Sequence, residues 1–162
     1  VLRGEWKNEK THELKATIDG KAAPAGSINW RVKNDSYKNE FGFKGSMTGT
    51  DIVEVTDAVT GAIKVRNSGI VRVECVSNAT QQVVCSVVVI VPGDVNRDGG
   101  VMSDDASLVM DAELDTALFP TFDLNNHKTW FWNIMADMNA DTLVQSDDAD
   151  FILDLDLGTL EI

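Results

Sequence analysis

The sequence of 162 residues predicts a multi-domain protein, with an all-β domain over residues 1–92 and a small all-α domain over residues 93–162. Three observations predict this division: a change of charge at the boundary, alternating apolar residues before it, and an internal repeat after it. Each half is long enough to bury a hydrophobic core of its own.

The charge changes sharply after Pro92. Residues 1–92 carry 12 Lys and Arg against 10 Asp and Glu, a net charge of +2, whereas residues 93–162 carry 2 against 16, a net charge of −14. An acidic surface argues against nucleic acid and anionic membranes as partners, because phosphate groups require Lys and Arg. No segment approaches the ~18 apolar residues that span a bilayer, so we expect no membrane insertion. A chain that begins at Val1 without Met is expected to be a piece of a larger precursor.

Residues 1–92 contain short segments in which apolar and polar residues alternate, as in half-buried β-strands. The expected strands are 14–18, 28–32, the pair Phe41 and Phe43, 52–56, 63–65, 69–76 and 83–91. About seven strands with turns at this spacing predict a β-sandwich of the immunoglobulin type.

The last two segments predict a hairpin whose register is set by its apolar residues. A register that places Cys75 opposite Cys85 gives one continuous apolar face, which a slip of one residue would destroy. The same register places Val73 opposite Val87. Two cysteines are too few for a disulfide framework, and a free Cys on an apolar face behaves as a small hydrophobe. We favour free thiols, although the sequence also permits a cross-strand disulfide.

The C-terminal domain contains an internal repeat. An offset of 43 residues aligns residues 93–114 with 136–157, and ten of these 22 positions are identical. Each copy consists of a twelve-residue loop with oxygen-bearing side chains at positions 1, 3, 5 and 12, followed by apolar residues at helical spacing. Two unrelated acidic runs would not share the ligand spacing, the following Ser-Asp-Asp sequence and the helix, so a merely solvated acidic face is disfavoured.

This spacing of oxygens suits calcium, which takes six to eight oxygen ligands around a tight turn. In the first loop the expected ligands are the side chains of Asp94, Asn96, Asp98 and Asp105 and the carbonyl of Gly100. In the second loop they are the side chains of Asp137, Asn139, Asp141 and Asp148 and the carbonyl of Leu143. Thr142 replaces the glycine expected at position 6, where φ is positive, so either this loop bends differently or its ion binds more weakly.

Both loops end in Asp and precede a single helix, and in this they resemble dockerin modules over roughly residues 93–162. The resemblance implies a small all-α dockerin with two EF-hand-like calcium loop–helix repeats. It also implies a cohesin module of a scaffoldin or cell-surface anchoring protein as partner, within a cellulosome-type complex for polysaccharide degradation. The parent would then be secreted and extracellular, and either an enzyme or a scaffoldin.

By the same resemblance, the partner-binding residues are Ser103, Asp104, Leu108, Asp111, Ser146, Asp147, Phe151 and Asp154. The alternative is that the Ser-Asp pairs only cap their helices and supply first-turn charge. The duplicated pairs would permit two binding orientations. Differences between the helices, and the long connection 115–136, favour one orientation. Trp130, Phe131 and Trp132 in that connection are expected to pack in a core or between the domains, or alternatively to form a partner-binding patch.

Three segments of the first half, 28–30, 55–61 and 67–73, resemble bacterial immunoglobulin-like (group 2) domains. The match covers roughly residues 10–91, and such a domain beside a dockerin is known as an X module. No flexible linker separates the last strand from Asp94, so we expect the first domain to pack against the second and stabilise it.

We expect no catalytic activity. The carboxylates with clear spacing are committed to metal, which would lower their pKa values and leave no acid of raised pKa. The chain has no glycine-rich phosphate loop, and its two histidines form no zinc pattern. The alternative function is an EF-hand calcium sensor or buffer attached to an immunoglobulin-like adhesion domain. A sensor would stay folded without calcium, whereas a dockerin should lose its helices.

Overall fold

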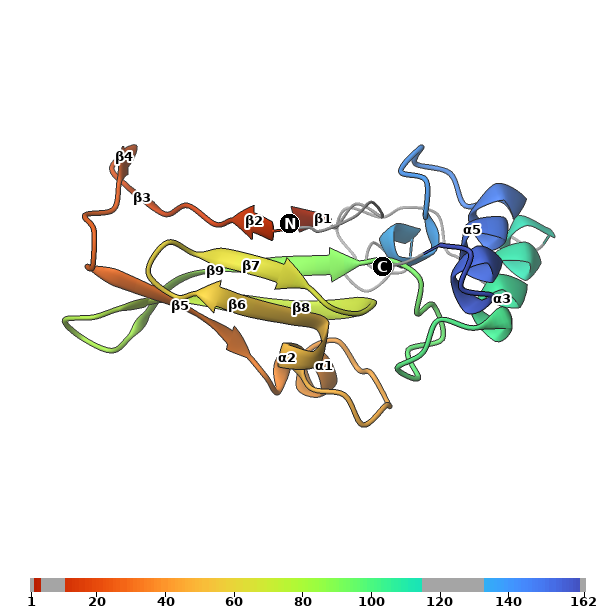
Figure 1. Cartoon of the computed structure of the whole chain (residues 1–162), viewed down its shortest axis with the longest axis horizontal. Helices are drawn as coiled ribbons and strands as arrows, with labels where there is room; N and C mark the ends of the chain where they lie inside the picture. Colours follow the sequence, from red (N-terminus) through yellow and green to blue (C-terminus); the bar gives the residue numbers. More distant parts are fainter. Residues whose placement is uncertain (1, 4–10, 115–132, 161–162) are drawn as a thin grey trace.

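The computed structural model describes residues 2–3, 11–114 and 133–160, so Trp130, Phe131 and Trp132 of the connection lie outside the described residues. The strands are β1 (Leu2–Arg3), β2 (Thr11–Glu13), β3 (Thr17–Ile18), β4 (Lys21–Ala22), β5 (Ile28–Lys33), β6 (Val53–Asp57), β7 (Ala62–Val65), β8 (Gly69–Ser77) and β9 (Val83–Val91). They form three small sheets, of order β1-β9-β8-β5, β2-β7-β6 and β3-β4 (Figure 1).

The two larger sheets share one hydrophobic core. Trp30 of β5, Val73 of β8 and Ile63 of β7 are buried in the same cluster. Leu14 also belongs to this cluster, although only Thr17–Ile18 of the expected strand 14–18 is extended in a ladder. Phe41 and Phe43 are buried too, but they follow a short helix and do not form the expected strand.

The hairpin register is confirmed. β8 and β9 pair antiparallel with Cys75 opposite Cys85 and Val73 opposite Val87. Both cysteines are free thiols, with Cys75 buried and Cys85 exposed. The apolar face is therefore covered along only part of the hairpin, and its outer end, including the first residues of β9, faces solvent.

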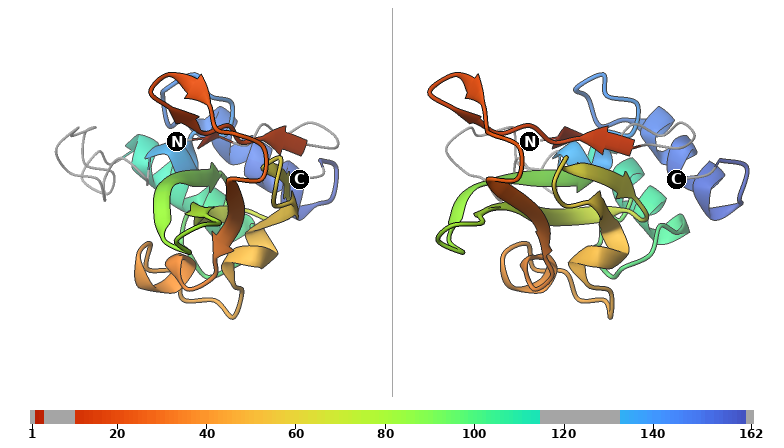
Figure 2. Two further views of the ribbon diagram at one scale, coloured as in Figure 1. Left: turned by 90° about the vertical axis from the view of Figure 1, so that its left-hand side faces the viewer. Right: turned by 60° about the vertical axis from the view of Figure 1, so that its left-hand side comes forward.

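Four helices can be bounded in the described residues: α1 (Ser36–Asn39), α2 (Gly49–Ile52), α3 (Ser103–Leu114) and α5 (Ser146–Asp156). Residues 133–136 form a further helical turn. α3 and α5 pack against each other at one end of the sheets (Figures 1 and 2). Their buried apolar side chains, including Val109 and Ile152, form a second core. No helix among these residues has the length and apolar character needed to cross a membrane.

The expected fold class, an immunoglobulin-like sandwich followed by a small all-α dockerin, is wrong. The helical turns α1 and α2 interrupt the strands, and β1 runs parallel to β9. The C-terminal part is not a separate all-α body, because Met135 lies in the core of the sheets and its carbonyl accepts a hydrogen bond from the N–H of Gly93 (2.9 Å). Local periodicity predicts strands and helices but not these contacts, which join residues far apart in the sequence.

Candidate metal sites

The two predicted loops follow the same backbone path. At position 4, Arg97 and Ala140 have positive φ angles of 65° and 68°, and at position 6, Gly99 and Thr142 have φ angles of 102° and 78°. The second loop therefore makes the same bend as the first and does so with a β-branched residue in the left-handed region. This conformation is strained, at a cost of roughly 1–3 kcal/mol.

The hydrogen bonds that close the loops are also repeated. In the first loop, Asp105 accepts hydrogen bonds from the backbone N–H groups of Asn96 (2.8 Å) and Met102 (3.0 Å). In the second loop, Asp148 accepts them from the N–H groups of Asn139 (3.1 Å) and Gln145 (3.0 Å). The Asp at position 12 thus ties the start of each loop to its end and fixes the loop against the helix that follows.

The Asn side chains at position 3 connect the loops to the Ser-Asp pairs. The amide nitrogen of Asn96 donates to the carboxylate of Asp104 (2.7 Å), and that of Asn139 donates to Asp147 at the same distance. Both Asp side chains remain exposed, although one oxygen of each reaches back to its loop. Ser146 is the first residue of α5 and not its N-cap, which is Gln145. The capping role considered for Ser146 is therefore not seen.

Two carboxylates of the first loop are buried, which makes their charged form costly. Asp94 and Asp105 are both 0% exposed. Burial, followed by the charges of Asp105 and Asp98, raises the pKa of Asp94 to about 7 against the opposing hydrogen bond from the N–H of Gly99. Burial likewise raises the pKa of Asp105, and that of Asp148 in the second loop. Buried carboxylates of this kind are costly in the charged form unless a cation accompanies them.

The first loop packs on the β region. The N–H of Lys44 donates to the carbonyl of Arg97 (2.8 Å), and the Arg97 guanidinium donates to the carbonyl of Phe41 (3.0 Å). The same guanidinium lies over the ring of Phe43, 6.0 Å from its centroid. Sequence reasoning missed these contacts, since Arg97 and Phe41 are 56 positions apart and nothing local marks the pair.

Ser68 holds the start of the loop. Its hydroxyl donates to the carbonyl of Val91 (2.9 Å) and accepts a hydrogen bond from the N–H of Asp94 (2.7 Å). Ser68 is buried, so the hydroxyl satisfies backbone groups that water cannot reach. The first ligand position is thereby fixed to the end of β9.

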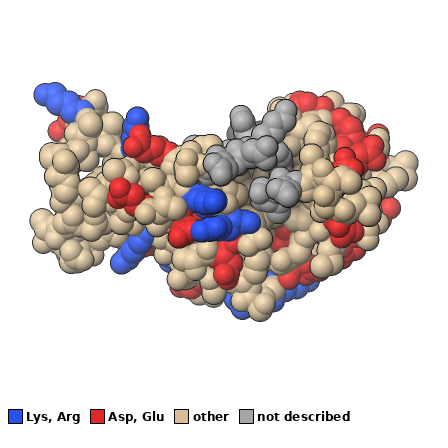
Figure 3. Space-filling view, viewed as in Figure 1, with Lys and Arg blue, Asp and Glu red and all other residues tan. Residues whose placement is uncertain are grey.

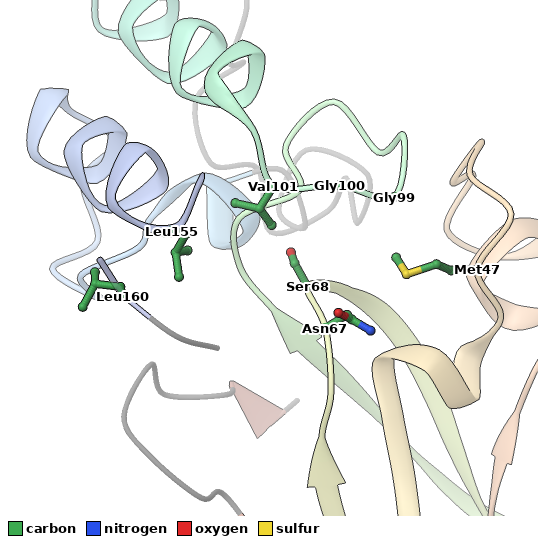
Figure 4. A pocket seen from close by; sticks show the side chains of 8 residues that line it. All are labelled: Met47, Asn67, Ser68, Gly99, Gly100, Val101, Leu155 and Leu160. Atoms are coloured by element: carbon green, nitrogen blue, oxygen red, sulfur yellow. The ribbon is translucent and has the colours of Figure 1, made fainter. Parts of the chain in front are cut away.

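A cavity of about 240 Å³ lies where the β region, the first loop and the C-terminal end of α5 with the segment after it meet. Met47, Asn67 and Ser68 line it from the β region, and Val101 lines it from the loop (Figure 4). Leu155 and Leu160 close it from the C-terminal side. The expected site residues of the first loop are therefore next to this junction and not on an isolated domain.

The expected partner-binding residues are mostly exposed. On α3 these are Ser103, Asp104 and Asp111, and on α5 they are Ser146, Asp147, Phe151 and Asp154. Leu108 is half-buried and packs against the second core. Figure 3 shows Asp and Glu side chains gathered over the end of the molecule where α3 and α5 lie. The two helices thus present one acidic, largely accessible surface.

In the described ranges, no three His, Cys, Asp or Glu side chains converge as a metal-binding group. The chemistry of the donors still fits calcium, because each loop offers three carboxylates, one amide oxygen and one carbonyl, all of them hard oxygen ligands. The repeated turn and the buried carboxylates of the first loop fit it as well.

No protein-family model matches the chain, and no curated protein is significantly similar to it. Function must therefore be inferred from the residues themselves: the paired loops, the exposed faces of α3 and α5, and the contacts of the first loop.

Proposed function

We propose that the chain is a calcium-dependent, non-catalytic assembly module that binds a cohesin module of a scaffoldin or cell-surface anchoring protein in a cellulosome-type complex. The observation that carries the proposal is the duplication of the loops in sequence, in backbone angles and in hydrogen bonds. Selection on a single acidic surface would not require the same left-handed backbone conformation at positions 4 and 6 of both loops.

The first ion would be held by the side chains of Asp94, Asn96, Asp98 and Asp105 and the carbonyl of Gly100. The second would be held by the corresponding residues of the second loop, Asp137, Asn139, Asp141, Leu143 and Asp148. Bound calcium supplies positive charge that offsets the mutual repulsion of these carboxylates. The terminal Asp of each loop then keeps the following helix in place through the hydrogen bonds that it accepts from backbone N–H groups at both ends of the loop.

The partner would contact the exposed faces of α3 and α5. The Ser-Asp pairs at the start of each helix are accessible, and Phe151 adds a ring that is 37% exposed. A surface with this charge favours a partner whose complementary face carries Lys or Arg. Since Leu108 is half-buried where Phe151 is exposed, the two repeats offer different surfaces, and we favour a single binding orientation.

The proposal extends to the parent protein as regards its location. It would be secreted and extracellular, either free or attached to the cell surface through its partner. The chain itself would serve for assembly, since its clearest carboxylate constellations are those suited to metal and no competing catalytic pattern accompanies them.

The test is titration calorimetry of the intact chain against a panel of cohesins, first with calcium and then with EDTA. We expect tight binding to at least one cohesin in calcium and none in EDTA. The double variant Asp104→Ala/Asp147→Ala should weaken binding, whereas Glu113→Ala, which removes an exposed charge elsewhere on α3, should leave it unchanged. Absence of binding to every cohesin, with helices intact in EDTA, would instead support a calcium sensor or buffer attached to an adhesion domain.

A further inference from the structure

Tyr37 of α1 is a polar residue that the proposed function does not use. Its side chain is 0% exposed, and its ring stacks on Phe43 with the centroids 4.3 Å apart. Among the described residues its hydroxyl has no hydrogen-bond partner. A buried hydroxyl without a partner is costly, typically by about 1–3 kcal/mol in proteins, so its position calls for a functional explanation.

The hydroxyl of Tyr37 is directed at the first loop. A Cβ atom placed on Gly99, at position 6 of that loop, would lie 3.3 Å from the Tyr37 oxygen. The carboxylates of Asp94 and Asp98 are close enough for their charges to act on the phenol. Both are expected ligands, at positions 1 and 5, so the phenol lies beside the oxygen set and not beside an unrelated part of the loop.

The packing around Tyr37 is fixed from several sides. Gly45 approaches the loop so closely that a Cβ there would lie 2.3 Å from the carbonyl oxygen of Asp98. Arg97 is held by the carbonyl of Phe41, and Lys44 holds the carbonyl of Arg97. The segment from α1 to Gly45 therefore packs closely against positions 4 to 6 of the loop, and the phenol of Tyr37 is a polar group within this contact.

We propose that Tyr37 is a positioning residue for the first calcium site: with calcium bound, its hydroxyl donates a hydrogen bond to one of the two carboxylates near it, that of Asp94 or that of Asp98. This inference rests on calcium binding by the first loop. Groups that orient ligands from outside the coordination shell commonly contribute tenfold to a hundredfold in metal affinity. The second loop is mostly exposed around positions 4 to 7 and has no such residue among those described, so the effect is confined to the first site.

The test is Tyr37→Phe, which keeps the ring and its stacking on Phe43 but removes the hydroxyl. Calcium affinity is measured by titration calorimetry in a chain that also carries Asp141→Asn, so that the second loop is weakened and the first is read alone. We expect the first-site affinity to fall roughly tenfold to a hundredfold. The reciprocal background, Asp98→Asn, reports the second site, whose affinity should not respond to Tyr37→Phe.

Thermal unfolding separates this role from simple packing. In EDTA, Tyr37→Phe should leave the Tm unchanged or raise it, because the variant removes an unpartnered buried hydroxyl. In saturating calcium it should lower the Tm relative to the unsubstituted chain. Equal calcium affinity of the two chains, or the same Tm change in both conditions, would overturn the inference. Failure of the unsubstituted chain to bind calcium at all would instead overturn the proposed function.

Discussion

Asp94 combines three properties that a surface carboxylate does not have. It is fully buried, it is the first residue of the first loop, and its pKa is raised to about 7 by burial and by the nearby charges of Asp105 and Asp98. At neutral pH a proton therefore competes with a cation for this side chain. We therefore expect calcium binding at the first loop to depend on pH close to neutrality, although an ordinary Asp titrates near pH 4.

We predict that calcium binding at the first loop weakens by about tenfold per pH unit below pH ~7, because the proton on Asp94 must leave. Calorimetry in buffers of different ionisation enthalpy should detect proton release at pH 6 and none at pH 9.

Without calcium, the effect of pH has the opposite sign, because lowering the pH stabilises the folded chain. A folded-state pKa above the unfolded value means that the folded chain gains stability as the pH falls through about 7, so the Tm in EDTA should be higher at pH 5.5 than at pH 8. Binding without proton release at pH 6 would contradict the raised pKa.

Thr142 carries the strain that distinguishes the second loop from the first, since it holds a φ of 78° where the first loop has Gly99. We predict that Thr142→Gly raises the calcium affinity of the second loop roughly fivefold, corresponding to the release of about 1 kcal/mol of backbone strain. The matched exchange Gly99→Thr should weaken the first loop, because it adds both strain and a contact with Tyr37. Calorimetry on the two variants compares their calcium affinities. An unchanged second-site affinity in Thr142→Gly would show that the strain is already present in the calcium-free loop and is not incurred on binding.

At the scale of the elements, the first loop is held between the end of β9 and the segment that follows α1. Ser68 fixes its first residue, and Lys44 and Phe41 fix its fourth. The second loop makes the same internal hydrogen bonds but is largely exposed at positions 4 to 7. Two loops that share seven of their twelve residues are thereby placed in different surroundings, and we expect the first to bind calcium more firmly.

A substitution at Gly45 tests whether contact with the β region affects calcium binding by the first loop. We predict that Gly45→Ala lowers the first-site calcium affinity at least tenfold, about 1.4 kcal/mol, because its Cβ would lie 2.3 Å from the carbonyl oxygen of Asp98 and the loop would have to move. Lys44→Ala is the matched control, since it leaves the backbone N–H that bonds Arg97 intact. Both are measured with Asp141→Asn present. Equal affinities for the two variants would mean that the loop adopts its binding conformation without support from the β region.

At the scale of the whole molecule, the net charge changes sharply after Pro92, but the hydrophobic core does not divide at the same point. The last 70 residues carry a net charge of −14, yet Met135 belongs to the core shared by the sheets. In the described part of the chain, α3 and α5 are joined by the smaller cluster around Val95, Val109 and Ile152 and by a hydrogen bond from the N–H of Ser103 to the carboxylate of Asp156 (3.1 Å). The packing of α3 and α5 therefore depends on a small core that must oppose strong repulsion between acidic side chains. The sheets, formed by residues 1–92 with a net charge of +2, do not face this repulsion.

We predict that calcium removal selectively unfolds the helical end. In EDTA at low salt, circular dichroism should lose the helical signal, and amide exchange should become fast in α3 and α5 while β8 and β9 stay protected. Raising the salt from 0.01 M to 0.1 M shortens the Debye length from ~30 Å to ~10 Å, so part of the helical signal should return. Uniform protection of both parts in EDTA would contradict this and favour the sensor alternative.

The sequence by itself determined what depends on local spacing. The alternation of Val73, Cys75 and their partners set the register of the hairpin, because a shift of one residue would have turned the apolar side chains to solvent. The 43-residue repeat predicted both loops and the oxygen-bearing residues expected to bind calcium, because those residues lie within twelve positions of one another.

Only the tertiary structure decided the fold class and the surroundings of the loops. The helical turns α1 and α2 and the parallel pairing of β1 with β9 contradict a simple sandwich followed by an all-α domain. Tyr37, Gly45 and Ser68 carry no motif, and each reaches the first loop across more than 20 residues of chain. Such contacts are selected by the packing of the whole core, which no local pattern encodes, and so two loops of similar sequence came to lie in different environments.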